Sequence, residues 1–241
     1  MPETIVLLEG GEACGKSTTA KWLCEEHGFH LIKLPTPGSA FEDVIFGRGE
    51  RIEKPSLQQK AICAMMDFAN QMQLAITKHD RIVLDRGPLS TFAYQSPADA
   101  VKAVAVTEAT KYIDAITHVI ILDVDVEVGL AREEVKNEVS AAGLEFHKKV
   151  NQRYRDMSVP MQTILRHRLA DDIIGCERGT LNAAEYLVRS MERASKEWVE
   201  CYDLVAWKWK SLKDFLFLDT NPDKLTWNQV RKAVEDSIGL A

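Results

Sequence analysis

Residues 9–18 read Glu-Gly-Gly-Glu-Ala-Cys-Gly-Lys-Ser-Thr, and this stretch decides how the rest of the chain is interpreted. The apolar run 5–8 before it has the right length for a buried parallel strand, and residues 19–24 after it have the character of a helix. Gly10 and Gly15 bracket four residues, a spacing that lets backbone N–H groups turn towards phosphate oxygens where a Cβ would obstruct them. A strand, a glycine loop and a helix in this order predict a phosphate-binding loop.

The residues that close this loop suit a nucleoside triphosphate and its metal ion. Lys16 is placed to reach the β and γ phosphates as a point charge, and Ser17 is placed to offer its hydroxyl to Mg²⁺. The positive end of the following helix faces the same anion. A purely structural glycine turn is the alternative, and the strand-to-helix context disfavours it.

Composition excludes several classes of protein. The 241 residues suffice for one α/β domain that includes an insertion, and the net charge of -6 shows no excess of basic residues of the kind that binds nucleic acid. The five cysteines are odd in number and have no C-x-x-C spacing, which argues against a disulfide framework and against a zinc site. Residues 1–8 lack a basic signal-peptide start, and no apolar run approaches the length of a membrane span. We therefore expect a cytoplasmic protein with no membrane partner.

A second group of polar residues ends another buried strand. The apolar run 82–84 leads directly into Asp85 and Arg86. A carboxylate and a guanidinium are costly to bury at the tip of a strand unless they have partners, and Mg²⁺ with a phosphate would supply them. A structural ion pair is the alternative, but together with the phosphate-binding loop the pair favours a functional site.

The remaining chain predicts further α/β elements. We expect strands near residues 29–34, 117–125 and 215–219, and helices near 56–78, 98–115, 127–139, 145–154 and 227–238. Asp123 and Asp125 end a strand and are second candidates for a metal or ribose contact. Residues 157–214 carry no strand signal, and Pro160, Gly175 and Gly179 interrupt them, so we expect a helical insertion before the last strand.

These motifs, in this order, resemble the thymidylate kinase family of P-loop nucleoside monophosphate kinases. Residues 9–18 match the loop of that family, and residues 85–95 match its D-R-x-x-x-S-x-x-A-Y-Q signature. Residues 122–132 resemble its L-D-V-D-x-x-x-G-L-x-R segment, and residues 146–154 resemble its F-H-x-x-V-x-x-x-Y helix. The resemblance covers roughly residues 4–155.

The resemblance implies a five-stranded parallel sheet flanked by helices, in a single P-loop kinase domain over residues 1–241 with the helical insertion at about 157–214. It also implies a homodimer that binds no nucleic acid, with ATP and Mg²⁺ as cofactors, and transfer of the γ-phosphoryl group to a deoxynucleoside monophosphate. Lys16, Asp85 and Arg86 would be catalytic, and Ser17 and Asp85 would hold the metal. ATP would bind to Gly10, Gly11, Ala13, Cys14, Gly15, Lys16, Ser17, Thr18 and Arg132. The acceptor would bind to Glu12, Phe68, Gln71, Arg86, Ser90, Tyr94 and Gln95.

The chain also departs from the family pattern, mostly on the acceptor side. Residues 35–38 read Pro-Thr-Pro-Gly where the family has R-E-P-G, and the third helix has Phe68 or Gln71 near the position of a second arginine. The lid segment offers only Lys136 after Arg132, so positive charge would otherwise come from an arginine of the insertion, such as Arg166, Arg168 or Arg178. The nucleobase of the acceptor therefore stays open. A deoxynucleoside kinase and a non-catalytic nucleotide-binding protein are the alternative functions.

Overall fold

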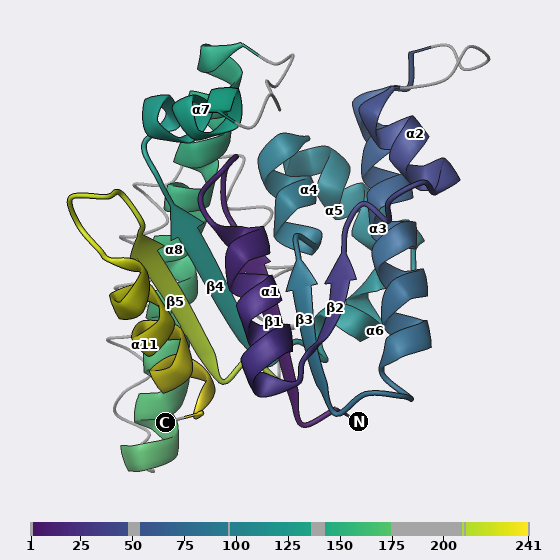
Figure 1. The fold of residues 1–241 in the computed structure, drawn as a ribbon. Helices are drawn as coiled ribbons and strands as arrows, with labels where there is room; N and C mark the ends of the chain where they lie inside the picture. The colour runs from purple at the N-terminus through teal and green to yellow at the C-terminus, as the bar shows by residue number, and fades with distance from the viewer. Residues whose placement is uncertain are drawn as a thin grey trace.

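Five parallel strands form the centre of the molecule (Figure 1). The computed structural model describes residues 2–47, 54–95, 97–135, 143–174, 209 and 211–240. The strands are β1 (Thr4–Glu9), β2 (His30–Lys33), β3 (Arg81–Asp85), β4 (His118–Asp123) and β5 (Asp214–Asp219), and they pair in the order β2-β3-β1-β4-β5. The expected five-stranded parallel sheet is confirmed.

Helices cover both faces of the sheet, because successive side chains of a strand point to opposite faces. In β1, Val6 and Leu8 pack in the apolar cluster under α1 (Lys16–His27) and α11 (Trp227–Ile238). Ile5 and Leu7 pack in the larger cluster on the other face. That cluster is completed by α3 (Leu57–Ala75), α4 (Pro88–Tyr94), α5 (Pro97–Val106), α6 (Ala109–Ile113) and α8 (Leu144–Ile174).

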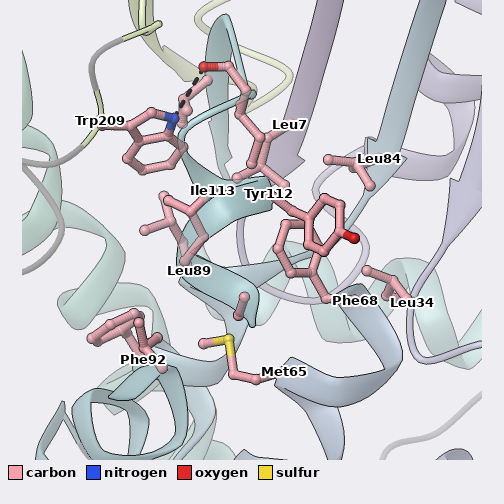
Figure 2. Packing of buried hydrophobic residues seen from close by; sticks show 14 of the residues in the cluster. Leu7, Leu34, Met65, Phe68, Leu84, Leu89, Phe92, Tyr112, Ile113 and Trp209 are labelled. Carbon is pink, nitrogen blue, oxygen red and sulfur yellow. Dashed lines mark hydrogen bonds between the residues drawn. The ribbon is translucent and has the colours of Figure 1, made fainter. Parts of the chain in front are cut away.

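The larger cluster includes residues far apart in the chain (Figure 2). Trp209 is fully buried, and its indole N–H donates to the carbonyl oxygen of Ile116 at 3.0 Å. Helix α3 begins where expected, because the Ser56 hydroxyl accepts from the backbone N–H of Gln59 and the Gln59 side chain returns a bond to the Ser56 N–H. Local capping and long-range packing thus agree on where α3 lies.

Two expectations for the helices were wrong. Residues 98–115 form two helices, α5 and α6, separated near Thr107, whose hydroxyl bonds back to the carbonyl of Ala103 at 2.8 Å. Pro160 does not end a helix: α8 continues through it to Ile174, although proline lacks the backbone N–H that a helix interior uses. Gly175, Gly179 and most of the expected insertion lie outside the described residues, so the insertion stays a prediction. In the described ranges, no helix has the length and apolar character required to cross a bilayer.

Strand register brings the two sequence motifs together. Strands β1 and β3 are neighbours, and Leu8 is paired with Asp85. Because all strands run in the same direction, the loop after β1 and the Asp85–Arg86 pair leave the same edge of the sheet. Helices α2 (Ala40–Phe46) and α7 (Val126–Val135) rise on opposite sides of this edge (Figure 1).

Candidate active site

The loop between β1 and α1 requires glycine at two positions. Gly10 has φ 138°, and a Cβ there would lie 2.0 Å from the carbonyl oxygen of Leu122 on β4. Gly15 has φ 104° and precedes the first turn of α1. Because an L side chain is strained at both conformations, these residues allow the loop to turn tightly over the end of the sheet.

The ammonium group of Lys16 lies within this loop. It donates to the carbonyl of Gly10 at 3.1 Å and to that of Gly11, and its side chain is largely buried. On the other side of the loop, Arg132 of α7 donates to the carbonyl of Ala13 at 3.1 Å. Two cations from different elements thus converge on one short stretch of backbone.

Ser17 and Asp85 form the next layer of the site. The Ser17 hydroxyl donates to the Asp85 carboxylate at 2.6 Å, and Asp85 is only 3% exposed. A hydroxyl and a carboxylate are the hard oxygen ligands that Mg²⁺ prefers, so this pair fits the ion. In the described part of the chain, no three His, Cys, Asp or Glu side chains gather into a metal site.

Arg86 turns towards the phosphate loop. Its Nη2 lies 2.8 Å from each oxygen of the Glu12 carboxylate, and its guanidinium lies over the Tyr94 ring at 4.9 Å from the centroid. The Tyr94 hydroxyl donates to Glu12 at 2.8 Å. Burial by itself would raise the pKa of Glu12, but the charges of Arg86 and Lys16 outweigh it and the pKa is lowered. Glu12 is therefore a carboxylate at neutral pH.

Behind this pair lies a buried polar cluster formed by Glu9, Ser90 and Tyr154. Glu9 has no exposed surface and accepts from the Ser90 N–H at 3.0 Å, the Ser90 hydroxyl at 2.6 Å and the Tyr154 hydroxyl at 2.9 Å. Burial raises the pKa of Glu9, against the effect of these three donors. The cluster joins β1, α4 and α8 next to Arg86. The sequence analysis assigned no role to Glu9 or Tyr154, although an acid directly after four apolar residues was a signal.

One cleft of about 2020 Å³ unites most of these residues. Its lining includes Ala13, Cys14, Gly15, Lys16, Ser17 and Thr18, Arg132 of α7, and Glu12, Asp85, Arg86, Ser90, Tyr94 and Gln95. Gly10 and Gly11 form the turn and do not line the cleft. The sequence analysis missed further lining residues: Lys33, Lys60 and Asp67, and Pro222, Leu225 and Trp227.

Phe68 and Gln71, which were predicted to contact the acceptor, do not line this cleft. Phe68 is 1% exposed and packs in the larger apolar cluster beside Tyr112 and Leu34 (Figure 2). Gln71 lines a second depression of about 590 Å³, whose lining also includes Asp67. Asp67, rather than Phe68, lines the cleft, as Leu57, Lys60 and Ala64 do earlier on α3, because the next residue of a helix points about 100° away. An acid within the apolar stripe of α3 was the signal that could have identified it.

Two other candidates are engaged elsewhere. Asp123 accepts from Arg155 Nε at 2.7 Å, Asp125 lies 3.6 Å from Arg155 Nη2, and neither lines the cleft. The structure therefore does not support them as metal or ribose contacts. Lys136, Arg178 and the side chains of Arg166 and Arg168 lie outside what the structure describes, so a contribution of theirs to the lid stays a prediction.

Comparison with known proteins agrees with this geometry. The sequence model of a family described as AAA domain matches residues 5–171. The thymidylate kinase of Cutibacterium acnes is 29% identical over 180 residues, which cover 66% of this chain and 84% of that protein. The thymidylate kinase of Rhodopseudomonas palustris is 28% identical over 185 residues, which cover 66% and 79%. The resemblance to thymidylate kinases is thus confirmed.

A solved structure extends the similarity to the fold. The deoxyadenosine kinase from M. mycoides with bound dATP matches with a TM-score of 0.53 at 15% identity, covering 98% of this chain and 100% of that chain. At this level of identity the match shows a common fold.

Proposed function

This chain belongs to the AAA domain family, and we propose that it is an ATP-dependent kinase that phosphorylates dTMP or a related or modified deoxynucleoside monophosphate. One observation carries the proposal: the phosphate loop and the Asp85–Arg86 pair line a single cleft and are hydrogen-bonded to each other through Ser17 and Glu12. A cleft of this kind offers one cationic site to a triphosphate and a second to the phosphate of an acceptor. The similarity to thymidylate kinases supports the same function.

On the donor side, the loop would hold the triphosphate. Backbone N–H groups of residues 13–18 would surround the β phosphate, and Lys16 would leave its loop carbonyls to contact the β and γ phosphates. Arg132 would lie against the adenine ring, from a position already fixed by its bond to Ala13. Magnesium, held by Ser17 and Asp85, would neutralise charge that develops on the transferring phosphoryl group.

On the acceptor side, the chemistry favours a monophosphate over a nucleoside. The second pKa of a phosphate monoester is about 6, so its attacking oxygen is ionised at neutral pH and needs no general base. It needs positive charge to overcome repulsion between two anions, and Arg86 would provide it. Glu12 would then contact the sugar hydroxyl. A nucleoside acceptor would require a base for its hydroxyl proton, and Glu12, whose pKa is lowered, is poorly suited to that role.

The test is a coupled assay for ADP formation with ATP and Mg²⁺. Deoxynucleoside monophosphates and deoxynucleosides are offered separately to the wild type and to Lys16→Met and Asp85→Asn variants. We expect turnover of a monophosphate, reduced at least about 100-fold in kcat by either substitution. Lys21→Met is the matched control, because Lys21 lies on the same helix with a side chain that is 73% exposed.

Each other outcome points to a different function. Turnover of deoxynucleosides without turnover of monophosphates would identify a deoxynucleoside kinase. ATP binding by calorimetry, without turnover of any acceptor, would identify a non-catalytic nucleotide-binding protein. Unchanged kcat in Lys16→Met would refute the role given to the loop.

A further inference from the structure

A buried carboxylate lines the acceptor end of the cleft. Asp67 of α3 is 1% exposed, and its two oxygens accept from the backbone N–H and the hydroxyl of Thr36, each at 2.7 Å. It lines the cleft together with Pro35 and Pro37, which flank Thr36, and with Ala64, one turn earlier on α3. Its position is therefore fixed from two elements.

Asp67 retains capacity to accept further hydrogen bonds. Each carboxylate oxygen can accept two bonds, and Thr36 provides one to each. Among the described residues, no lysine or arginine forms an ion pair with Asp67. Gln95 lines the same cleft, and its side-chain oxygen is buried and accepts no hydrogen bond from the described part of the chain. The lining of the cleft thus includes hydrogen-bond acceptors that can receive further bonds from a ligand.

The nucleobases differ in the donors that they offer. Adenine, cytosine and guanine each carry an exocyclic amino group, whereas thymine carries carbonyl oxygens at its exocyclic positions and has only its ring N3–H as a donor on that edge. A thymine carbonyl opposite Asp67 would meet a negative charge and receive no hydrogen bond. An amino group would donate to that charge.

We propose that Asp67 selects an acceptor whose base carries an exocyclic amino group, so that dAMP, dCMP or dGMP is a better substrate than dTMP. The inference rests on the proposed function and narrows its acceptor. Residues 35–38 and the stripe of α3 are also where the sequence departs from the thymidylate kinase pattern, in keeping with a different base. A good bidentate pair of hydrogen bonds to a base edge discriminates by about 1–3 kcal/mol, which corresponds to a ratio of about 5- to 150-fold in kcat/KM.

The test compares kcat/KM for dAMP, dCMP, dGMP and dTMP in the wild type and two variants. Asp67→Asn removes the charge and adds donors, so we expect the preference for amino-bearing acceptors to fall at least about 10-fold, mainly through KM. Thr36→Val removes the hydroxyl that positions the carboxylate but leaves its charge. We expect this control to change kcat/KM for all four substrates by a similar factor.

The outcomes separate this inference from the function on which it rests. No turnover of any monophosphate would overturn the proposed function, and the inference with it. Turnover with dTMP preferred by the wild type would overturn the inference alone. The inference would also fail if Asp67→Asn reduced kcat/KM equally for all four substrates, since that result indicates a structural role. The same holds if Thr36→Val changed the preference among the four substrates as much as Asp67→Asn did.

Discussion

Removal of the Tyr154 hydroxyl tests whether the buried cluster behind Arg86 stabilises the fold. Tyr154 is 1% exposed, and its hydroxyl donates to Glu9 at 2.9 Å. Phenylalanine keeps the ring and nearly all of its packing, so Tyr154→Phe removes only the hydroxyl, with its hydrogen bond to Glu9 and its 3.0 Å contact with the Ser90 hydroxyl. Glu9 would keep only the two donors of Ser90.

The magnitude follows from the charge of the acceptor. A hydrogen bond to a charged group contributes about 1.5–3 kcal/mol, and a buried carboxylate cannot replace the lost donor with water. We therefore expect a loss of about 2 kcal/mol in the free energy of unfolding. For a domain of this size that lowers Tm by about 4–8 °C.

The effect should also depend on pH. Burial raises the pKa of Glu9, and the Tyr154 hydroxyl acts in the opposite direction, so the variant should have a still higher Glu9 pKa. A carboxyl group whose pKa is raised by folding lowers the free energy of unfolding when it is ionised. It no longer does so at a pH low enough for it to be protonated in both the folded and the unfolded state. The difference in the free energy of unfolding between the wild type and Tyr154→Phe should therefore become smaller as the pH falls.

Urea denaturation followed by circular dichroism, at several pH values, measures these effects. Tyr112→Phe is the matched control, because Tyr112 is 2% exposed in the same apolar cluster and its hydroxyl makes no hydrogen bond to the described residues. We expect the control to change stability by less than about 0.5 kcal/mol. Equal effects of the two substitutions would refute the role assigned to the cluster.

Three further substitutions test the loop, the core and a buried histidine. Gly10→Ala should cost at least about 3 kcal/mol and abolish ATP binding by calorimetry, because the new Cβ would lie 2.0 Å from the Leu122 carbonyl; normal binding would contradict the loop geometry. Trp209→Phe should lower the free energy of unfolding, measured by urea denaturation, by about 2 kcal/mol, because it leaves the Ile116 carbonyl without its hydrogen-bond donor. An unchanged urea midpoint would show that this hydrogen bond does not stabilise the fold. Burial lowers the pKa of His118 to about 4. As the pH falls, this histidine is therefore protonated in the unfolded chain before it is protonated in the folded protein, and the free energy of unfolding should decrease by up to about 3 kcal/mol between pH 6.5 and about pH 4. His118→Asn should reduce the pH dependence of the free energy of unfolding, and a pH dependence equal to that of the wild type would show that other groups cause it.

Much of the site was accessible from the sequence because its key residues follow one another along the chain. Lys16 and Ser17 belong to one loop, and Asp85 and Arg86 end one strand. Asp67 was missed because its importance depends on the direction of its side chain. Periodicity identified the stripe of α3 but could not tell which of two adjacent residues, Asp67 or Phe68, faces the cleft.

Local chemistry, then, determined the strands, the glycine loop and the helix caps, since each depends on residues within a few positions of one another. Only the tertiary structure decided which side chains meet across the cleft. The Ser17–Asp85 and Glu12–Arg86 contacts arise because β3 lies beside β1 in one particular register. Strand order and register depend on how two apolar faces pack against helices from the whole chain, and no single segment encodes them.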